Sequence, residues 1–161
     1  MARKEKLALD LGGPVLKAQG GSTPEGYAAA LPTPGSFDGA RRLYRECFDG
    51  RVILLSQCTA EIELVKRTWL KEKRFHEQTG IPPEALRFVR RPEEKALVCI
   101  AEDVTHFVDD RPHILQHAIG HVPYLYLFAP DPDEVKAHPE LLRHADIMQN
   151  WSELLKRLIP W

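Results

Sequence analysis

The chain of 161 residues suits one compact domain and leaves little room for a second. Its 43% apolar and 28% charged residues lie in the globular range, and its net charge of −1 provides no bulk field that would attract nucleic acid or an anionic membrane. Three cysteines without a C-x-x-C pair indicate reduced thiols, and no apolar run is long enough to cross a membrane. We therefore expect a single cytoplasmic domain over residues 1–161, with neither a membrane nor a nucleic acid as partner.

Hydrophobic periodicity and the placement of glycine and proline predict the elements in chain order. Up to residue 58 they are a strand at Lys6–Leu9, a flap over 12–38 with an extended piece at Pro14–Ala18, a helix at Gly39–Phe48 and a strand at Arg51–Ser56. Beyond it they are a helix from Thr59 to about Gln78, a strand at Leu86–Val89, a helix from Glu93 to about Ile100, a strand at Thr105–Val108, a helix from Pro112 to near Gly120, a strand at Val122–Phe128, a loop over 129–140 and a helix at Met148–Ile159.

Strands alternate with helices along this order, which predicts an α/β fold. The specific expectation is a single three-layer, Rossmann-like domain with a mainly parallel sheet and helices on both faces, the segment 141–161 packing on it through a C-terminal helix. Ligands of such sheets bind at the carboxyl ends of the strands.

Polar side chains follow several of the predicted strands where these end. Asp10 follows the first strand, Ser56 ends the second, and Asp109 and Asp110 follow the fourth, while Lys95 opens the helix before that strand. Because the carboxyl ends of parallel strands meet at one edge, we expect these side chains to converge there.

The chain resembles the haloacid dehalogenase superfamily of hydrolases over residues 6–128. LALDLGGPV is similar to the first family motif, an apolar strand ending in the nucleophilic aspartate, and VILLS to the second, which ends in serine or threonine. RRPEEKALV is similar to the third, with its lysine, and THFVDD to the fourth, with its acidic pair. The resemblance implies a phosphoric monoester hydrolase, and the short interval between motifs implies a member without a folded cap.

The resemblance also implies a role for each of these residues. Asp10 would attack the phosphorus and form an aspartyl-phosphate, Ser56 would hydrogen-bond a phosphoryl oxygen, and Lys95 would offset negative charge beside Asp10. Mg²⁺, which takes oxygen ligands, would be held by Asp10, the backbone carbonyl of Gly12, Asp109 and, assisting, Asp110. The backbone amides of Gly12 and Gly13 would approach the phosphate.

Gly12 departs from the family pattern. The phosphatases carry a second aspartate at this position, which protonates the leaving oxygen, and such a group typically contributes about 10²–10⁴-fold. Three interpretations stay open: substrates whose leaving groups need no acid, a substitute residue from the flap over 12–38, or a weak or inactive member that binds and regulates. Dehalogenase or phosphonate chemistry also stays open.

Other residues have competing interpretations. His113 and His117 have a spacing that suits zinc, and Cys58 lies near Ser56, although a thiol nucleophile needs an electropositive setting. The apolar face of the helix at Met148–Ile159, which includes Trp151, is expected to pack on the core, with a homodimer contact as the alternative. The partner that the resemblance implies is a phosphorylated substrate.

Overall fold

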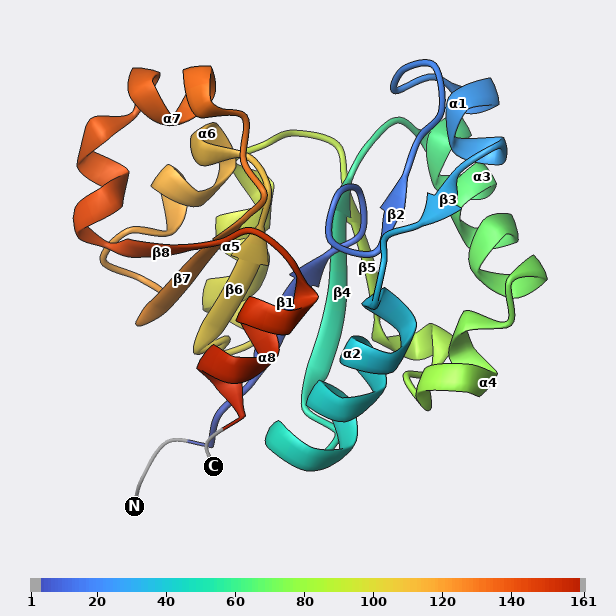
Figure 1. Ribbon diagram of the computed structural model, residues 1–161, viewed down its shortest axis with the longest axis horizontal. Coiled ribbons are helices and arrows are strands. Elements are labelled where there is room, and N and C mark those ends of the chain that lie inside the picture. The colour runs from blue at the N-terminus through green and yellow to red at the C-terminus, as the bar shows by residue number, and fades with distance from the viewer. Residues whose placement is uncertain (1–3, 160–161) are drawn as a thin grey trace.

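The computed structural model describes residues 4–159 and contains a six-stranded parallel sheet in the order β5-β4-β1-β6-β7-β8 (Figure 1). Its strands are β1 Leu7–Asp10, β4 Val52–Gln57, β5 Leu86–Val89, β6 His106–Asp109, β7 Tyr124–Phe128 and β8 Ala145–Met148. Two short strands, β2 Leu16–Lys17 and β3 Leu31–Pro32, form a separate antiparallel pair. The predicted α/β class with a mainly parallel sheet is confirmed.

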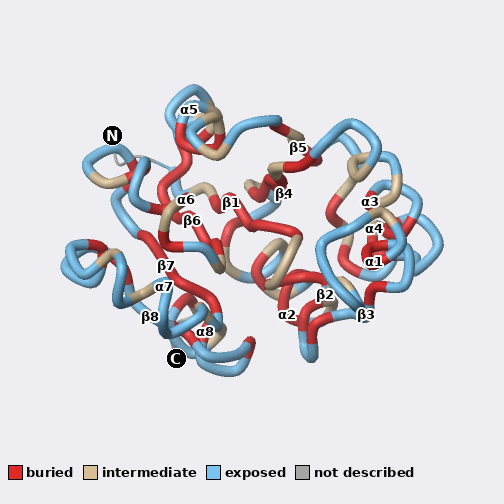
Figure 2. Tube along the Cα trace, turned by 90° about the horizontal axis from the view of Figure 1, so that it is seen from above, coloured by how far each residue is buried: buried red, intermediate tan, exposed pale blue. Residues whose placement is uncertain are grey.

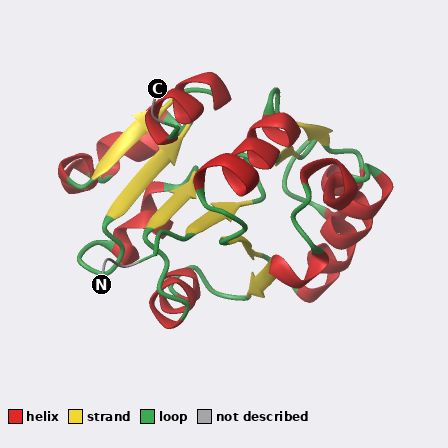
Figure 3. Ribbon diagram, turned by 90° about the horizontal axis from the view of Figure 1, so that it is seen from below, coloured by secondary structure: helices red, strands yellow, loops and turns green. Residues whose placement is uncertain are grey.

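Helices cover both faces of the sheet (Figure 3). They are α1 Pro24–Ala28, α2 Ser36–Arg42, α3 Ala60–Glu72, α4 Phe75–Thr79, α5 Glu94–Ala101, α6 Pro112–Leu115, α7 Pro132–Ala137 and α8 Trp151–Leu158. Short helical turns are η1 Leu43–Cys47, which is π-helical, and the 3₁₀ turns η2 Pro83–Ala85, η3 Gln116–Ala118 and η4 Pro139–Arg143.

The core divides into two clusters because successive strand residues point to opposite faces of the sheet. Leu7 and Leu9 of β1 belong to the cluster beneath α2, α3 and α8, whereas Ala8 belongs to the cluster beneath α5 and α6. Every residue of β1 is buried, as are most of β4 and β6 (Figure 2). This central position explains why the strands that flank the candidate site read as continuous apolar runs.

The prediction of a plain loop over 129–140 is wrong, and the strand β8 was missed. The loop contains α7, which begins at Pro132 with the side chain of Asp131 accepting a hydrogen bond from the Asp133 amide. In β8 the two middle residues, Asp146 and Ile147, are exposed, as is common on an edge strand. That pattern hides the strand, and the predicted last helix accordingly starts at Trp151, after an Asn150 cap, instead of at Met148.

Two further segments differ from prediction. The helix capped by Thr59 does not continue to Gln78, because Arg74 adopts a left-handed conformation with φ of 58° and separates α3 from α4. The flap over 12–38 is structured: it contains β2, α1 and β3. The other predicted elements are present with ends shifted by a few residues.

The prediction of one domain over 1–161 includes residues 1–3 and 160–161, which lie outside the described residues. Within 4–159, no helix has both the length and the apolar character needed to cross a membrane.

Candidate functional site

The ends of β1 and β6 bring two carboxylates together at the centre of the sheet. The strands pair in parallel with Leu9 opposite Val108, so that Asp10 and Asp109 leave the sheet at the same edge. Asp109 is fully buried and Asp10 nearly so. This is the convergence that the strand-end pattern predicts.

Lys95, from the first turn of α5, links these carboxylates. Its ammonium donates hydrogen bonds to Asp10 Oδ1 at 2.8 Å and to Asp109 Oδ2 at 2.7 Å, and its side chain is buried. Burial disfavours the charged amine, but the two carboxylates outweigh this effect and raise the pKa of Lys95. The three side chains form a buried ion-pair network contributed by three separate elements.

Asp110 completes an acidic cluster. One oxygen each of Asp10, Asp109 and Asp110 lies within 4.8 Å of the others. Burial raises the pKa of Asp110 to about 9 and that of Asp109 to about 6, and repulsion from Asp10 adds to both shifts. An arrangement of carboxylate oxygens that repel one another in this way fits a hard divalent cation such as Mg²⁺. The residues present therefore fit the ion that the resemblance implies.

Ser56 is brought to the same region but does not line the cavity in front of the acidic cluster. Its side chain is fully buried, and its hydroxyl accepts a hydrogen bond from Lys66 Nζ at 2.8 Å. The cavity has a volume of about 240 Å³. The residues that line it include Asp10, Gly12, Ser22, Tyr27, Gln57, Cys58, Lys66, Lys95, Asp109, Asp110 and Arg111.

Gly12 faces two side chains that sequence reasoning missed. A Cβ atom at this position would lie 3.4 Å from Tyr27 Oη and 3.8 Å from Lys66 Nζ. Tyr27 comes from α1 in the flap, and nothing in its local sequence identifies it as a site residue. Lys66 had a detectable signal: it stands four residues after Ile62 and three before Trp69, on the inward face of α3, where a lysine is unusual.

Gly13 has a structural reason to be glycine. Its φ is +103°, and a Cβ atom would overlap the carboxylate of Asp110. Its amide donates to the Leu16 carbonyl at 2.9 Å, so the expectation that this amide would approach a phosphate is not met.

The competing interpretations of the other residues are weakened. Among the described residues, neither His113 nor His117 belongs to a group of three metal-binding side chains. Burial raises the pKa of the Cys58 thiol, which opposes a nucleophilic role. Trp151 is buried in the core cluster, as expected for a helix that packs on the domain.

The chain shares its fold with solved hydrolase structures. It aligns with D,D-heptose 1,7-bisphosphate phosphatase from B. bronchiseptica, crystallised with magnesium and phosphate, at a TM-score of 0.71 and 18% identity over 96% of this chain and 98% of that chain. It aligns with a haloacid dehalogenase-like hydrolase from Burkholderia xenovorans at a TM-score of 0.55 and 17% identity, over 78% of this chain and 57% of that chain. No family model and no curated protein matches the sequence. The fold implied by the resemblance is thereby confirmed.

Proposed function

We propose that the protein is a Mg²⁺-dependent phosphate-monoester hydrolase that works through an aspartyl-phosphate on Asp10. One observation carries the proposal: a buried carboxylate at the end of β1 lies beside a buried lysine and an acidic pair at the floor of a cavity. The shared fold with a phosphatase that was crystallised with magnesium and phosphate supports it.

In this proposal Asp10, Asp109 and Asp110, with the Gly12 carbonyl, would hold the ion. When bound, Mg²⁺ supplies positive charge that neutralises phosphoryl oxygens. The Asp10 carboxylate attacks phosphorus, and the bond from phosphorus to the leaving oxygen breaks with its electron pair on that oxygen. Water then attacks the aspartyl-phosphate, which releases inorganic phosphate and restores the carboxylate.

Lys95 orients the attacking group. Because its ammonium is bonded to both Asp10 and Asp109, it fixes the Asp10 carboxylate before substrate arrives and lowers the cost of holding several carboxylates together. Ser56, assigned to a phosphoryl oxygen by the resemblance, acts in this proposal through Lys66, to which it is bonded.

The test is turnover of p-nitrophenyl phosphate with and without Mg²⁺, in the wild type and in Asp10→Asn. We expect activity that needs Mg²⁺ and falls by several orders of magnitude in Asp10→Asn, which keeps the shape of the side chain but not its nucleophilic charge. Unchanged activity in this variant would exclude Asp10 as the nucleophile. If the wild type turns over no substrate in a broad phosphate panel but still binds Mg²⁺, the alternative of a binding or regulatory protein holds instead.

A further inference from the structure

Lys66 is a buried cation to which the proposed chemistry assigns only its bond to Ser56. Its side chain is only 3% exposed, yet it lines the cavity that contains Asp10. Its ammonium donates to Ser56 Oγ at 2.8 Å and lies 4.5 Å from the centre of the Tyr27 ring. Both neighbours hold the ammonium in place, and neither carries a negative charge.

Lys66 differs from Lys95 in having no counter-charge beside its ammonium in the described part of the chain. Lys95 is neutralised by two carboxylates at hydrogen-bond distance. Lys66 is as buried as Lys95, but within residues 4–159 no carboxylate lies at ion-pair distance from its ammonium. Burying an ammonium without a counter-charge is costly, so such a group is expected where an anion binds. The cavity in front of Lys66 is the place for that anion.

The position of Lys66 also accounts for Gly12. In the family that the chain resembles, the carboxylate at this position serves the leaving oxygen, and here Tyr27 Oη and Lys66 Nζ lie beside that position. We propose that Lys66 contacts the substrate and stabilises the leaving oxygen by positive charge, so that the protein acts on phosphoryl compounds with weakly basic leaving groups, such as acyl phosphates or phosphoanhydrides. This inference rests on the proposed function.

The electron balance of the step explains this substrate class. As the bond from Asp10 to phosphorus forms, the bond to the leaving oxygen breaks and both electrons stay on that oxygen. Lys66 donates a hydrogen bond to the resulting anion, and no proton needs to leave the protein. A weak base such as a carboxylate or a phosphate departs readily in this form, whereas an alkoxide needs an acid.

The experiment uses a series of aryl phosphates from dinitrophenyl to phenyl phosphate, at saturating Mg²⁺. Lys66→Met retains the apolar stem, Lys66→Arg retains the charge, and Tyr27→Phe retains the ring but not the hydroxyl. Lys71→Met, on the exposed side of α3, is the matched control. Thermal unfolding of each variant verifies that it is folded.

We expect Lys66→Met to lower kcat/KM by about 10²-fold, as removal of a preorganised donor typically does, with the largest loss for phenyl phosphate. Lys66→Arg should recover part of the rate, and Tyr27→Phe, which keeps the Lys66 charge, should lose less than Lys66→Met. Lys71→Met should stay within about threefold of the wild type, because Lys71 is exposed and does not line the cavity. An equal loss across the whole series in Lys66→Met, or a leaving-group-dependent loss of similar size in Tyr27→Phe, would overturn the assignment.

A binding measurement separates this inference from the proposed function. Calorimetric titration should show that Lys66→Met binds inorganic phosphate at least about tenfold more weakly, as expected when a charged hydrogen bond is lost, with Mg²⁺ binding unchanged. Wild-type affinity for phosphate in this variant would refute the role of Lys66, even if Asp10→Asn is inactive. Full activity in Asp10→Asn would instead refute the proposed function.

Discussion

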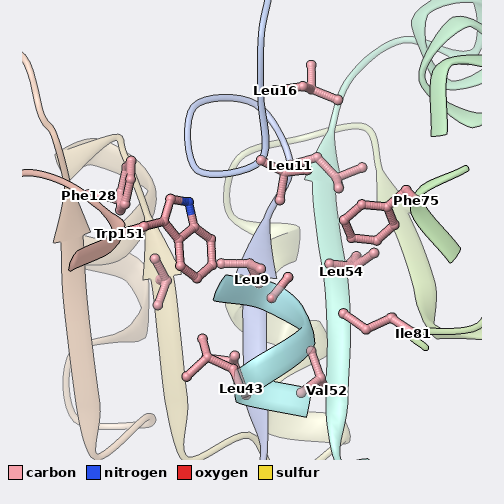
Figure 4. Close-up of a cluster of buried hydrophobic side chains, with 14 of the residues drawn as sticks. Leu9, Leu11, Leu16, Leu43, Val52, Leu54, Phe75, Ile81, Phe128 and Trp151 are labelled. Carbon is pink, nitrogen blue, oxygen red and sulfur yellow. The ribbon is translucent and has the colours of Figure 1, made fainter. Parts of the chain in front are cut away.

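The indole nitrogen of Trp151, at the start of α8, donates a hydrogen bond to the backbone carbonyl of Pro14 at 2.7 Å. Pro14 is buried and lies four residues after Asp10 in the loop that leaves β1. The indole also packs near Leu9 and Phe128 (Figure 4). One side chain therefore ties a helix late in the chain to the loop beside the proposed nucleophile.

Trp151→Phe tests this tie. The variant keeps an aromatic ring in the core but leaves the Pro14 carbonyl without its donor. We expect it to lower the free energy of unfolding by about 1–3 kcal/mol, the usual penalty for an unsatisfied buried polar group. Urea unfolding measures the change, with Leu97→Ala at an exposed position of α5 as control. A midpoint equal to that of the wild type would show that the hydrogen bond adds nothing to stability.

Gly39 of α2 lies directly against the indole ring of Trp151, so that an added Cβ atom would overlap ring carbons. Gly39→Ala is expected to destabilise the protein by about 1–3 kcal/mol through overpacking, although alanine favours helix. A double-mutant cycle with Trp151→Leu measures the effect. The cost of Gly39→Ala should shrink when the indole is absent, and an equal cost in both backgrounds would locate the strain elsewhere.

The raised pKa values of Asp109 and Asp110 predict how stability without metal depends on pH. The folded protein keeps protons on these carboxyls up to pH of about 6 and about 9, whereas the unfolded chain releases them near 3.8. The folded form therefore binds more protons over this range, and its stability falls as pH rises from about 4 to about 9. The unfolding free energy of the wild type minus that of Asp110→Asn should therefore fall as pH rises from about 4 to about 9.

Mg²⁺ should reverse this trend, because the ion binds the deprotonated carboxylates. Its stabilising effect, measured as the shift in the thermal midpoint at a fixed ion concentration, is expected to grow with pH. A shift that is constant or decreases from pH 6 to pH 9 would contradict the assignment of these residues as ligands.

Gly12→Asp separates two explanations of the absent second carboxylate. The backbone of Gly12 is not left-handed and can accept aspartate, whose carboxylate would lie beside Lys66 Nζ. We expect the new carboxylate to pair with Lys66 and to lower the rate for weakly basic leaving groups by about tenfold or more. A large increase in hydrolysis measured with p-nitrophenyl phosphate would show that the site lacks only an acid.

The sequence was sufficient to locate residues that lie at the ends of buried parallel strands. Asp10 and Asp109 follow continuous apolar runs, and the sheet brings them together whatever the rest of the chain does. Tyr27 could not be located in the same way, because its place depends on how the glycine-rich flap folds back onto α3. Local periodicity contains no information about that packing, which is a tertiary effect.

Local sequence patterns also do not identify an edge strand such as β8. β8 lies at the margin of the sheet, where only one neighbour pairs with it and its middle side chains face solvent. Neither continuous apolar character nor strict alternation is required of such a strand. The break at Arg74 is a single residue of positive φ inside an otherwise helical pattern, and arginine is not a residue type that signals a left-handed conformation.

The bridge from Lys95 to both Asp10 and Asp109 means that folding would not depend on the binding of the proposed ion. Zinc fingers, by contrast, remain unfolded until their ion arrives. Here an internal ammonium already neutralises much of the charge in the cavity. If the proposed ion binds, a chelator should thus remove it and leave a folded chain, without exposing the core to aggregation or proteolysis.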